Sequence, residues 1–208
     1  MSLSNYEAAE LWLGKPAGST YHRKGSNVSF NGDCFYSYST KIAEKYAADD
    51  GSDFILMTRW DYSVTTAKHK YHLHSGVNRL IIISLAGDYH VSLSQHLLKA
   101  VVDMNELENI CEKPEKCSIG TFRSYLQDWL ILANGIKQIF ELAKNRLKKE
   151  LRPEDRKLIK EKINKAEKMR AAWKEDPRFF GTGSGFGYIY QIHQNIKCAR
   201  PAFLNQLK

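Results

Sequence analysis

Hydroxyl, cationic and imidazole side chains gather between residues 60 and 74 of the chain. Four of them fall within five positions: Thr65, Thr66, Lys68 and His69. At the start of a helix, such groups together with unpaired backbone amides would suit a phosphate. The alternative is a helix that is capped by Thr65 or Thr66 and carries solvated polar side chains. His69 is therefore a candidate contact for a phosphate-bearing ligand, either in a binding site or in a small enzyme.

Three histidines, His69, His72 and His74, lie within six residues. On a strand, His72 and His74 would share a face, where neutral imidazoles commonly hold a metal. No carboxylate stands nearby at a spacing that would complete such a site, and the four cysteines lack zinc-finger spacing. We therefore expect neither a metal nor a cofactor.

An aromatic cluster between residues 30 and 43 is the second candidate site. Exposed aromatic side chains beside cations can stack unpaired nucleic-acid bases, which makes Tyr36 and Tyr38 candidate contacts. The alternative is that these rings fill a core. Asn31-Gly32 predicts a tight hairpin turn that places Tyr36 and Tyr38 on one face of the strand that follows.

Catalytic motifs are absent from the sequence, and no catalytic residue is assigned. Cys34 with a histidine could form a thiol–imidazole pair, but chain order does not establish proximity. The glycine-rich stretch 181–187 matches neither a P-loop nor a dinucleotide fingerprint. An enzyme therefore remains an uncertain and less favoured interpretation.

The positive charge of the chain is concentrated in one segment. Residues 137–174 hold fourteen Lys and Arg against six Asp and Glu, whereas the rest of the chain has seventeen of each. Such a field attracts nucleic acid, an acidic protein face or anionic lipid. Neither a recognition helix nor an RNA-recognition signature accompanies it, so contacts to phosphates are favoured. The candidate cations are Lys148, Lys149, Arg156, Lys160, Lys165 and Lys168.

The elements that position these residues indicate an α+β protein. Residues 54–58 and 80–85 read as strands, residues 93–110 as a helix, and residues 40–48 as a further helix. The stretch 65–74 fits either a strand or a helix. A heptad seam from Phe122 to Leu147 predicts one long helix, and Pro153 begins another that runs to about Lys174.

Two such helices with a short connection should pack as a long antiparallel hairpin. The seam could alternatively pair across a homodimer. We expect an α+β domain over residues 1–110, the basic hairpin over 118–176, and a segment over 177–208 that packs back on the first domain. Neither a signal peptide nor an apolar run long enough for a membrane span is recognised, which favours the cytoplasm over a membrane.

Two segments carry a resemblance to a known family. They are Tyr36-Ser37-Tyr38-Ser39-Thr40-Lys41-Ile42-Ala43 and Ser63-Val64-Thr65-Thr66-Ala67-Lys68-His69. Together they resemble an uncharacterised domain that recurs in bacteriophage and other mobile-element proteins, and the resemblance covers residues 20–90. It implies a phage or mobile-element origin, and hence the cytoplasm of a host cell, without implying a mechanism.

The function expected from these observations is that of a phage or mobile-element accessory protein that binds nucleic acid largely through the basic hairpin. A first alternative is a protein that inhibits a host nucleic-acid enzyme or defence complex, as anti-CRISPR-type proteins do, by meeting an acidic face. The second alternative is the small enzyme that uses His69 on a phosphate-bearing substrate.

Overall fold

The computed structural model describes residues 3–60, 63–74, 79–111 and 119–175. Within these ranges the chain forms a six-stranded sheet and six helices, which confirms the expected α+β class. The chain divides into two compact units, one of residues 1–100 and 135–153 and the other of residues 101–134 and 154–208. The segment 177–208, expected to pack on the first domain, lies outside the described residues.

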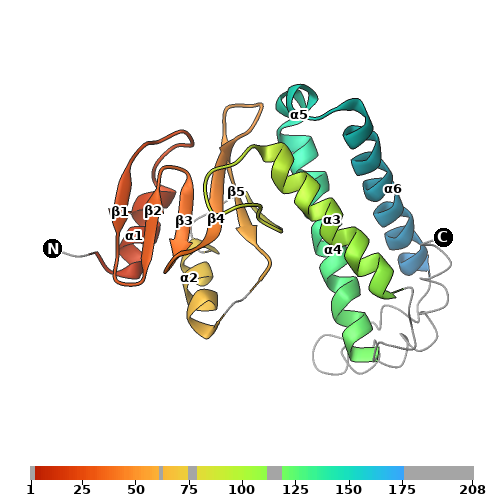
Figure 1. Ribbon diagram of the computed structural model, residues 1–208, viewed down its shortest axis with the longest axis horizontal. Coiled ribbons are helices and arrows are strands. Elements are labelled where there is room, and N and C mark those ends of the chain that lie inside the picture. The colour runs from red at the N-terminus through yellow and green to blue at the C-terminus, as the bar shows by residue number, and fades with distance from the viewer. Residues whose placement is uncertain (1–2, 61–62, 75–78, 112–118, 176–208) are drawn as a thin grey trace. The chain divides into compact units, whose positions relative to one another are not determined.

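The strands of the first unit lie side by side in chain order (Figure 1). Strands β1 to β5 pair antiparallel, and β6 pairs parallel with β5 after a crossover through a helix. The strands are β1 (His22–Lys24), β2 (Val28–Asn31), β3 (Cys34–Ser37), β4 (Thr40–Ala47), β5 (Asp53–Thr58) and β6 (Leu80–Ile83). The helices are α1 (Asn5–Leu13), α2 (Val64–His74), α3 (Leu93–Cys111), α4 (Ile119–Leu142), α5 (Lys144–Glu150) and α6 (Pro153–Glu175).

The predicted hairpin forms between β2 and β3. Asn31 pairs with Cys34, which leaves Gly32 and Asp33 as a two-residue loop, and Gly32 has the positive φ of 57° that such a turn needs. The prediction that Tyr36 and Tyr38 share one strand face is wrong, because β3 ends at Ser37. Tyr38 lies in the next turn with φ 54°, and its side chain is 58% exposed.

The prediction of a helix over residues 40–48 is wrong, because this segment is the central strand β4. Charged residues that would suit a helix surface are instead buried in the sheet. Lys41 pairs with Glu44, and the ammonium of Lys45 donates to the carbonyls of Trp12 (2.7 Å) and Leu13 (3.3 Å). Pairing to β3 and β5, together with these internal partners, overrides the local preference.

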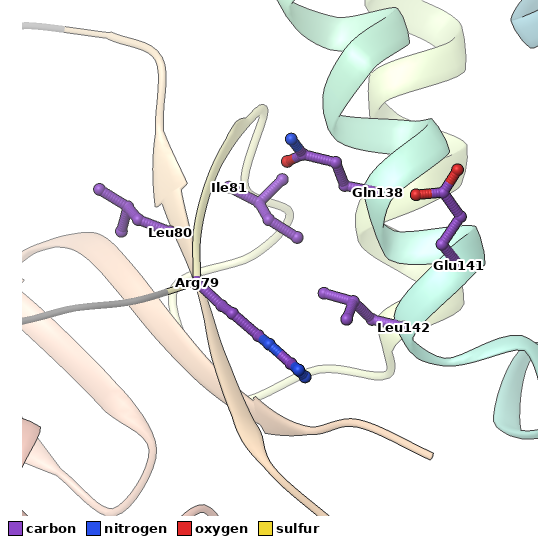
Figure 2. A pocket seen from close by; sticks show the side chains of 6 residues that line it. All are labelled: Arg79, Leu80, Ile81, Gln138, Glu141 and Leu142. Carbon is purple, nitrogen blue, oxygen red and sulfur yellow. The ribbon is translucent and has the colours of Figure 1, made fainter. Parts of the chain in front are cut away.

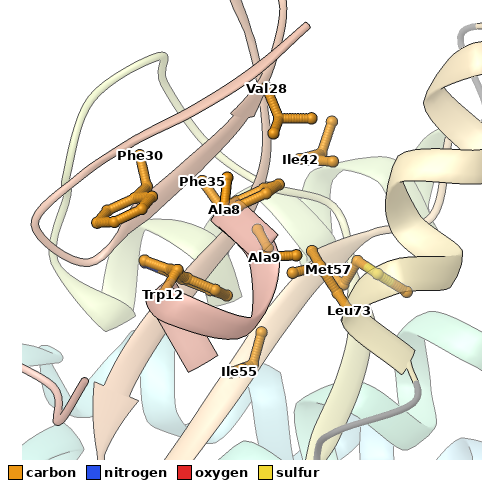
Figure 3. Packing of buried hydrophobic residues seen from close by; sticks show 11 residues of the cluster. Ala8, Ala9, Trp12, Val28, Phe30, Phe35, Ile42, Ile55, Met57 and Leu73 are labelled. Atoms are coloured by element: carbon orange, nitrogen blue, oxygen red, sulfur yellow. The ribbon is translucent and has the colours of Figure 1, made fainter. Parts of the chain in front are cut away.

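Helices α1 and α2 cover one face of the sheet and bury its hydrophobic core (Figure 3). Trp12 of α1, Phe35 of β3 and Leu73 of α2 are fully or almost fully buried there. Burying a side chain such as Phe35 stabilises the fold by about 1.5–3 kcal/mol. Because side chains alternate along a strand, the residues of β3 and β4 that do not enter this core face away from α1 and α2.

The ambiguous stretch 65–74 is a helix, and its cap differs from the expected one. The hydroxyl of Ser63 accepts from the amide of Thr66 at 3.1 Å, so Ser63 caps α2 rather than Thr65 or Thr66. The seam expected to form one long helix is also interrupted. Ala143, with φ −131° and ψ 37°, separates α4 from α5.

The last third of α4, residues 135–142, belongs to the first unit and packs closely on β6. A Cβ added to Gly135 would come within 2.6 Å of the carbonyl oxygen of Ile82, so glycine permits this approach. In the second unit, Glu108 of α3 accepts from the indole of Trp129 (3.0 Å) on α4 and from Lys162 (2.8 Å) on α6. The carboxylate of Glu108 therefore links α3 to both α4 and α6 in the described part of that unit. Among the described residues, none of the helices has the length and hydropathy to cross a membrane.

Candidate functional site

The carboxylate of Glu44, on β4, is completely buried and forms the centre of a polar cluster in the first unit. Its Oε2 accepts from Lys41 Nζ at 2.6 Å and from His96 Nε2 at 2.9 Å. Its Oε1 accepts from the Tyr46 hydroxyl at 2.7 Å and from the Val91 amide at 3.1 Å. The two oxygens are thus held by donors from β4, from the β6–α3 loop and from α3.

These donors keep Glu44 ionised. Burial alone would raise the pKa of the carboxyl, but the hydrogen bonds from His96, Lys41 and Tyr46 lower it to about 2. Lys41 is itself 1% exposed and also donates to the carbonyls of Ala86 (2.9 Å) and Tyr89 (2.6 Å). The buried negative charge is therefore matched by a buried positive charge that has its own carbonyl partners.

His96 is a neutral partner of Glu44. The backbone amide of Ala86 donates to Nδ1 of the ring at 2.8 Å, so the proton of the neutral ring is on Nε2 and points at Glu44. Burial lowers the pKa of His96 despite the neighbouring carboxylate. The ring thus acts as a hydrogen-bond donor and adds no charge to the cluster.

Two further side chains border Glu44, His90 and Cys34. Nδ1 of His90 lies 2.7 Å from Glu44 Oε1, and the His90 side chain is 52% exposed. Cys34 is a buried thiol whose pKa is raised to about 11 by burial and by the charge of Glu44. Ligand atoms of these three residues all lie within 4.8 Å of one another. A sulfur, an oxygen and a nitrogen donor therefore converge at the solvent-facing edge of the cluster.

The His69 ring, in contrast, joins three elements on the opposite face of the sheet. Asn5 Oδ1 accepts from the Asn27 amide at 2.8 Å, which turns its Nδ2 toward His69 Nε2 at 3.2 Å. The ring proton is therefore on Nδ1, which donates to Ser37 Oγ at 2.8 Å. Burial lowers the pKa of His69, so the ring is neutral at pH 7. A ligand could bind a ring nitrogen of His69 only after one of these hydrogen bonds is broken. The role of His69 in ligand binding stays a prediction.

The other predicted contact residues of this region differ from one another in solvent exposure. Thr66 is buried, Thr65 is half-buried and Lys68 is exposed on α2. Tyr36 is half-buried on the same strand face as Cys34, and burial raises the pKa of its hydroxyl. Tyr36 and Tyr38 therefore do not form one platform.

The predicted cations fall in both units. Lys148 and Lys149 are exposed on α5, while Lys160 and Lys168 are exposed on α6 and Arg156 is half-buried there. Lys165 lies 3.5 Å from Glu108. A role of these six residues in binding stays a prediction.

A cavity of about 260 Å³ in the first unit contains none of the predicted residues (Figure 2). Its one cationic lining residue already has a partner, because Arg79 pairs with Asp50 at 3.0 Å. The lining residues are Arg79, Leu80, Ile81, Gln138, Glu141 and Leu142.

Reasoning from the sequence missed the Glu44 cluster. Glu44 lay in the segment interpreted as a helix, and His96 is 52 positions away along the chain. The local pattern gave no strand signal, because Glu44 and Lys45 are adjacent and the charged residues do not alternate with the apolar ones.

The comparisons with known proteins concern the first part of the chain. Residues 6–80 match the model of a family of unknown function (DUF8033). No curated protein and no solved structure matches the chain. The match supports in part the resemblance to an uncharacterised domain, whereas the phage or mobile-element origin stays a prediction. The matched residues include Cys34, Glu44 and His69 but not His90 or His96.

Proposed function

We propose that the protein binds nucleic acid through phosphate contacts made by exposed lysines of α5 and α6. In this proposal α4, α5 and α6 form the basic helical hairpin expected from the sequence. A phage or mobile-element accessory role in the host cytoplasm belongs to the proposal and rests on the two motif segments described above.

The observation that carries the proposal is the division of the α6 lysines into two groups. Lys162 and Lys165 are directed to Glu108, at 2.8 and 3.5 Å. Lys157, Lys160 and Lys168 are exposed, and none of them pairs with another residue in the described part of the chain. Lys157, Lys160 and Lys168 can thus meet an external anion without first leaving a carboxylate partner in the described part of the chain.

The helical positions of these lysines support one outward stripe. Lys157, Asn164 and Lys168 follow spacings of seven and four, and Lys160 lies beside them, opposite the buried Ile159 and Ala166. Glu161 also lies in this stripe, so its charge is positive but not uniform. A surface of this kind fits the phosphates of a nucleic-acid backbone and lacks the groups for reading bases.

An aromatic surface on α1 and α2 offers a second contact, to unpaired bases. Tyr71 is 71% exposed and Tyr6 is 48% exposed. The ring of His72 lies between them in contact distance, 5.8 Å from Tyr6 and 6.5 Å from Tyr71 between centroids. Lys68 is exposed on the same helix. Rings beside a cation are the features that bind single strands with little sequence preference.

The test is fluorescence anisotropy with labelled single-stranded DNA, duplex DNA and RNA over a series of salt concentrations. Binding should weaken steeply with salt, since each phosphate contact contributes roughly one unit to the slope of log K against log[salt]. Lys160→Gln should lower that slope by about one, and adding Lys168→Gln should lower it by about one more.

The matched control is Lys24→Gln, which removes an exposed lysine from β1. The slope should be unchanged in this variant. Absence of binding at low salt would overturn the proposal and leave an acidic protein partner, as in a host-defence inhibitor. If the slope of log K against log[salt] were the same for Lys160→Gln and the wild type, Lys160 of α6 would not contact a phosphate.

A further inference from the structure

Three potential metal ligands from separate segments, one of them Glu44, meet in the polar cluster of the first unit. Cys34 comes from β3, Glu44 from β4 and His90 from the loop that follows β6. The thiol sulfur, a carboxylate oxygen and an imidazole nitrogen lie within 4.8 Å of one another. Ligand atoms that share one tetrahedral zinc ion are separated by about 3.2–3.8 Å, so small movements would bring these three to one ion.

The donor types select the class of metal. Thiolate and imidazole ligands suit zinc and neighbouring transition metals, whereas calcium and magnesium take oxygen ligands. Three protein ligands leave a fourth tetrahedral position for water. The half-exposed His90 places that position at the solvent-facing edge of the cluster.

The existing hydrogen bonds already orient the carboxylate for this role. Lys41 and His96 both hold Oε2, so Oε1 is the oxygen directed toward His90. The hydroxyl of Tyr46 lies 2.7 Å from both Glu44 Oε1 and the carbonyl of Val91, so it can donate to the carbonyl when Oε1 binds a metal. Such surrounding contacts fix ligand geometry and strengthen metal binding.

The contact between His90 and Glu44 marks the place of the ion. Nδ1 of His90 and Oε1 of Glu44 are 2.7 Å apart, so the Nδ1–H of the ring donates a hydrogen bond to the carboxylate. An ion can replace that proton if His90 moves outward by less than about 1 Å to reach ordinary ligand spacing. Because the His90 side chain is exposed, this movement disturbs little packing.

From this geometry we propose that Cys34 Sγ, Glu44 Oε1 and His90 Nδ1 bind one zinc-class ion, with water in the fourth position. Binding releases the thiol proton of Cys34 to solvent, and the single proton of the neutral His90 ring shifts by exchange with solvent from Nδ1 to Nε2, which frees Nδ1 for the ion. The site is independent of the nucleic-acid proposal, since it contains none of the exposed lysines.

The test is titration of the full chain with Co²⁺, in a Cys111→Ser, Cys117→Ser, Cys198→Ser background that leaves Cys34 as the sole thiol. One equivalent should bind and give the near-ultraviolet absorption of a sulfur-to-cobalt charge transfer. Zinc should then displace the cobalt and remove the band. Cys34→Ser should abolish the band even where some metal still binds.

His90→Ala keeps the proposal testable if substitutions of buried residues impair folding, because His90 is exposed. It should weaken Co²⁺ binding by at least roughly 10–100-fold, the loss that follows even from removing a residue that only orients a ligand. His74→Ala, at another exposed histidine, is the control and should leave the affinity unchanged. A folded protein without the charge-transfer band, or equal affinities for His90→Ala and the control, would overturn the proposal.

Discussion

The backbone amide of Ala86 donates to Nδ1 of His96 at 2.8 Å, and this single contact decides what His96 offers to Glu44. With Nδ1 occupied as an acceptor, the ring is neutral and its Nε2–H points at the carboxylate. The positive partner of Glu44 is therefore Lys41. The predictions below on stability follow from this assignment.

Removing the charge of Lys41 should destabilise the protein strongly. Lys41→Met leaves Glu44 buried without its cation, which typically costs about 3–5 kcal/mol in the free energy of unfolding. Adding Glu44→Gln should cost less than the sum of the two single changes, because an amide needs no cation. Urea denaturation measures both, with Lys68→Met as the exposed control. Equal stability of Lys41→Met and Lys68→Met would contradict the assignment.

Acid should destabilise the metal-free protein in two steps. His96 has a lowered pKa in the fold, so the unfolded chain takes up a proton first as the pH falls below about 6.5. Glu44, with a pKa of about 2 in the fold, remains ionised when the unfolded carboxyl is protonated near pH 4.5. Its contribution, about 3 kcal/mol, is present above that pH and is lost as the pH falls toward 2.

Urea denaturation at successive pH values, with a chelator present, measures this dependence. His96→Gln should flatten the profile just below pH 6.5, and Glu44→Gln should flatten it below pH 4.5. A profile that is unchanged by Glu44→Gln would show that other carboxyls cause the acid sensitivity.

The proton on His69 should respond to the side chain of residue 5. Asn5→Asp places a carboxylate against Nε2, where an amide now donates, so the ring should gain a second proton and its pKa should rise above its lowered value. NMR titration of the imidazole signals measures the change. Asn31→Asp, which adds the same charge at an exposed position of β2, is the control. A pKa that stays low in Asn5→Asp would mean that Nε2 does not face residue 5.

Single-stranded nucleic acid should lose affinity when Tyr71 is truncated. Tyr71→Ala removes an exposed ring beside His72, and a stacked base is worth roughly 1–3 kcal/mol, or about 5- to 150-fold in affinity. Duplex binding should change less because its bases are already stacked. Tyr89→Ala removes a ring that is 79% exposed on the β6–α3 loop and serves as the control. Equal losses in the two variants would argue against a specific aromatic contact.

Local patterns were sufficient for several elements of the fold. The turn signal at Asn31-Gly32, the apolar run at residue 80 and the proline at residue 153 each mark the element that the structure contains there. Such signals work because turn conformations, strand burial and helix starts depend on neighbouring residues. Local patterns failed for β4, where Lys41, Glu44 and Lys45 look like a helix surface until their distant partners are known.

The sequence by itself determined the fold class and the segment that carries the excess positive charge, because composition and periodicity are properties of neighbouring residues. Only the tertiary structure decided which polar groups act together. Glu44 meets His90 and His96 because the loop after β6 returns to β4, and no spacing along the chain records that approach. The protonation of His69 and His96 was likewise decided by single backbone or amide contacts, which exist only once the elements have packed.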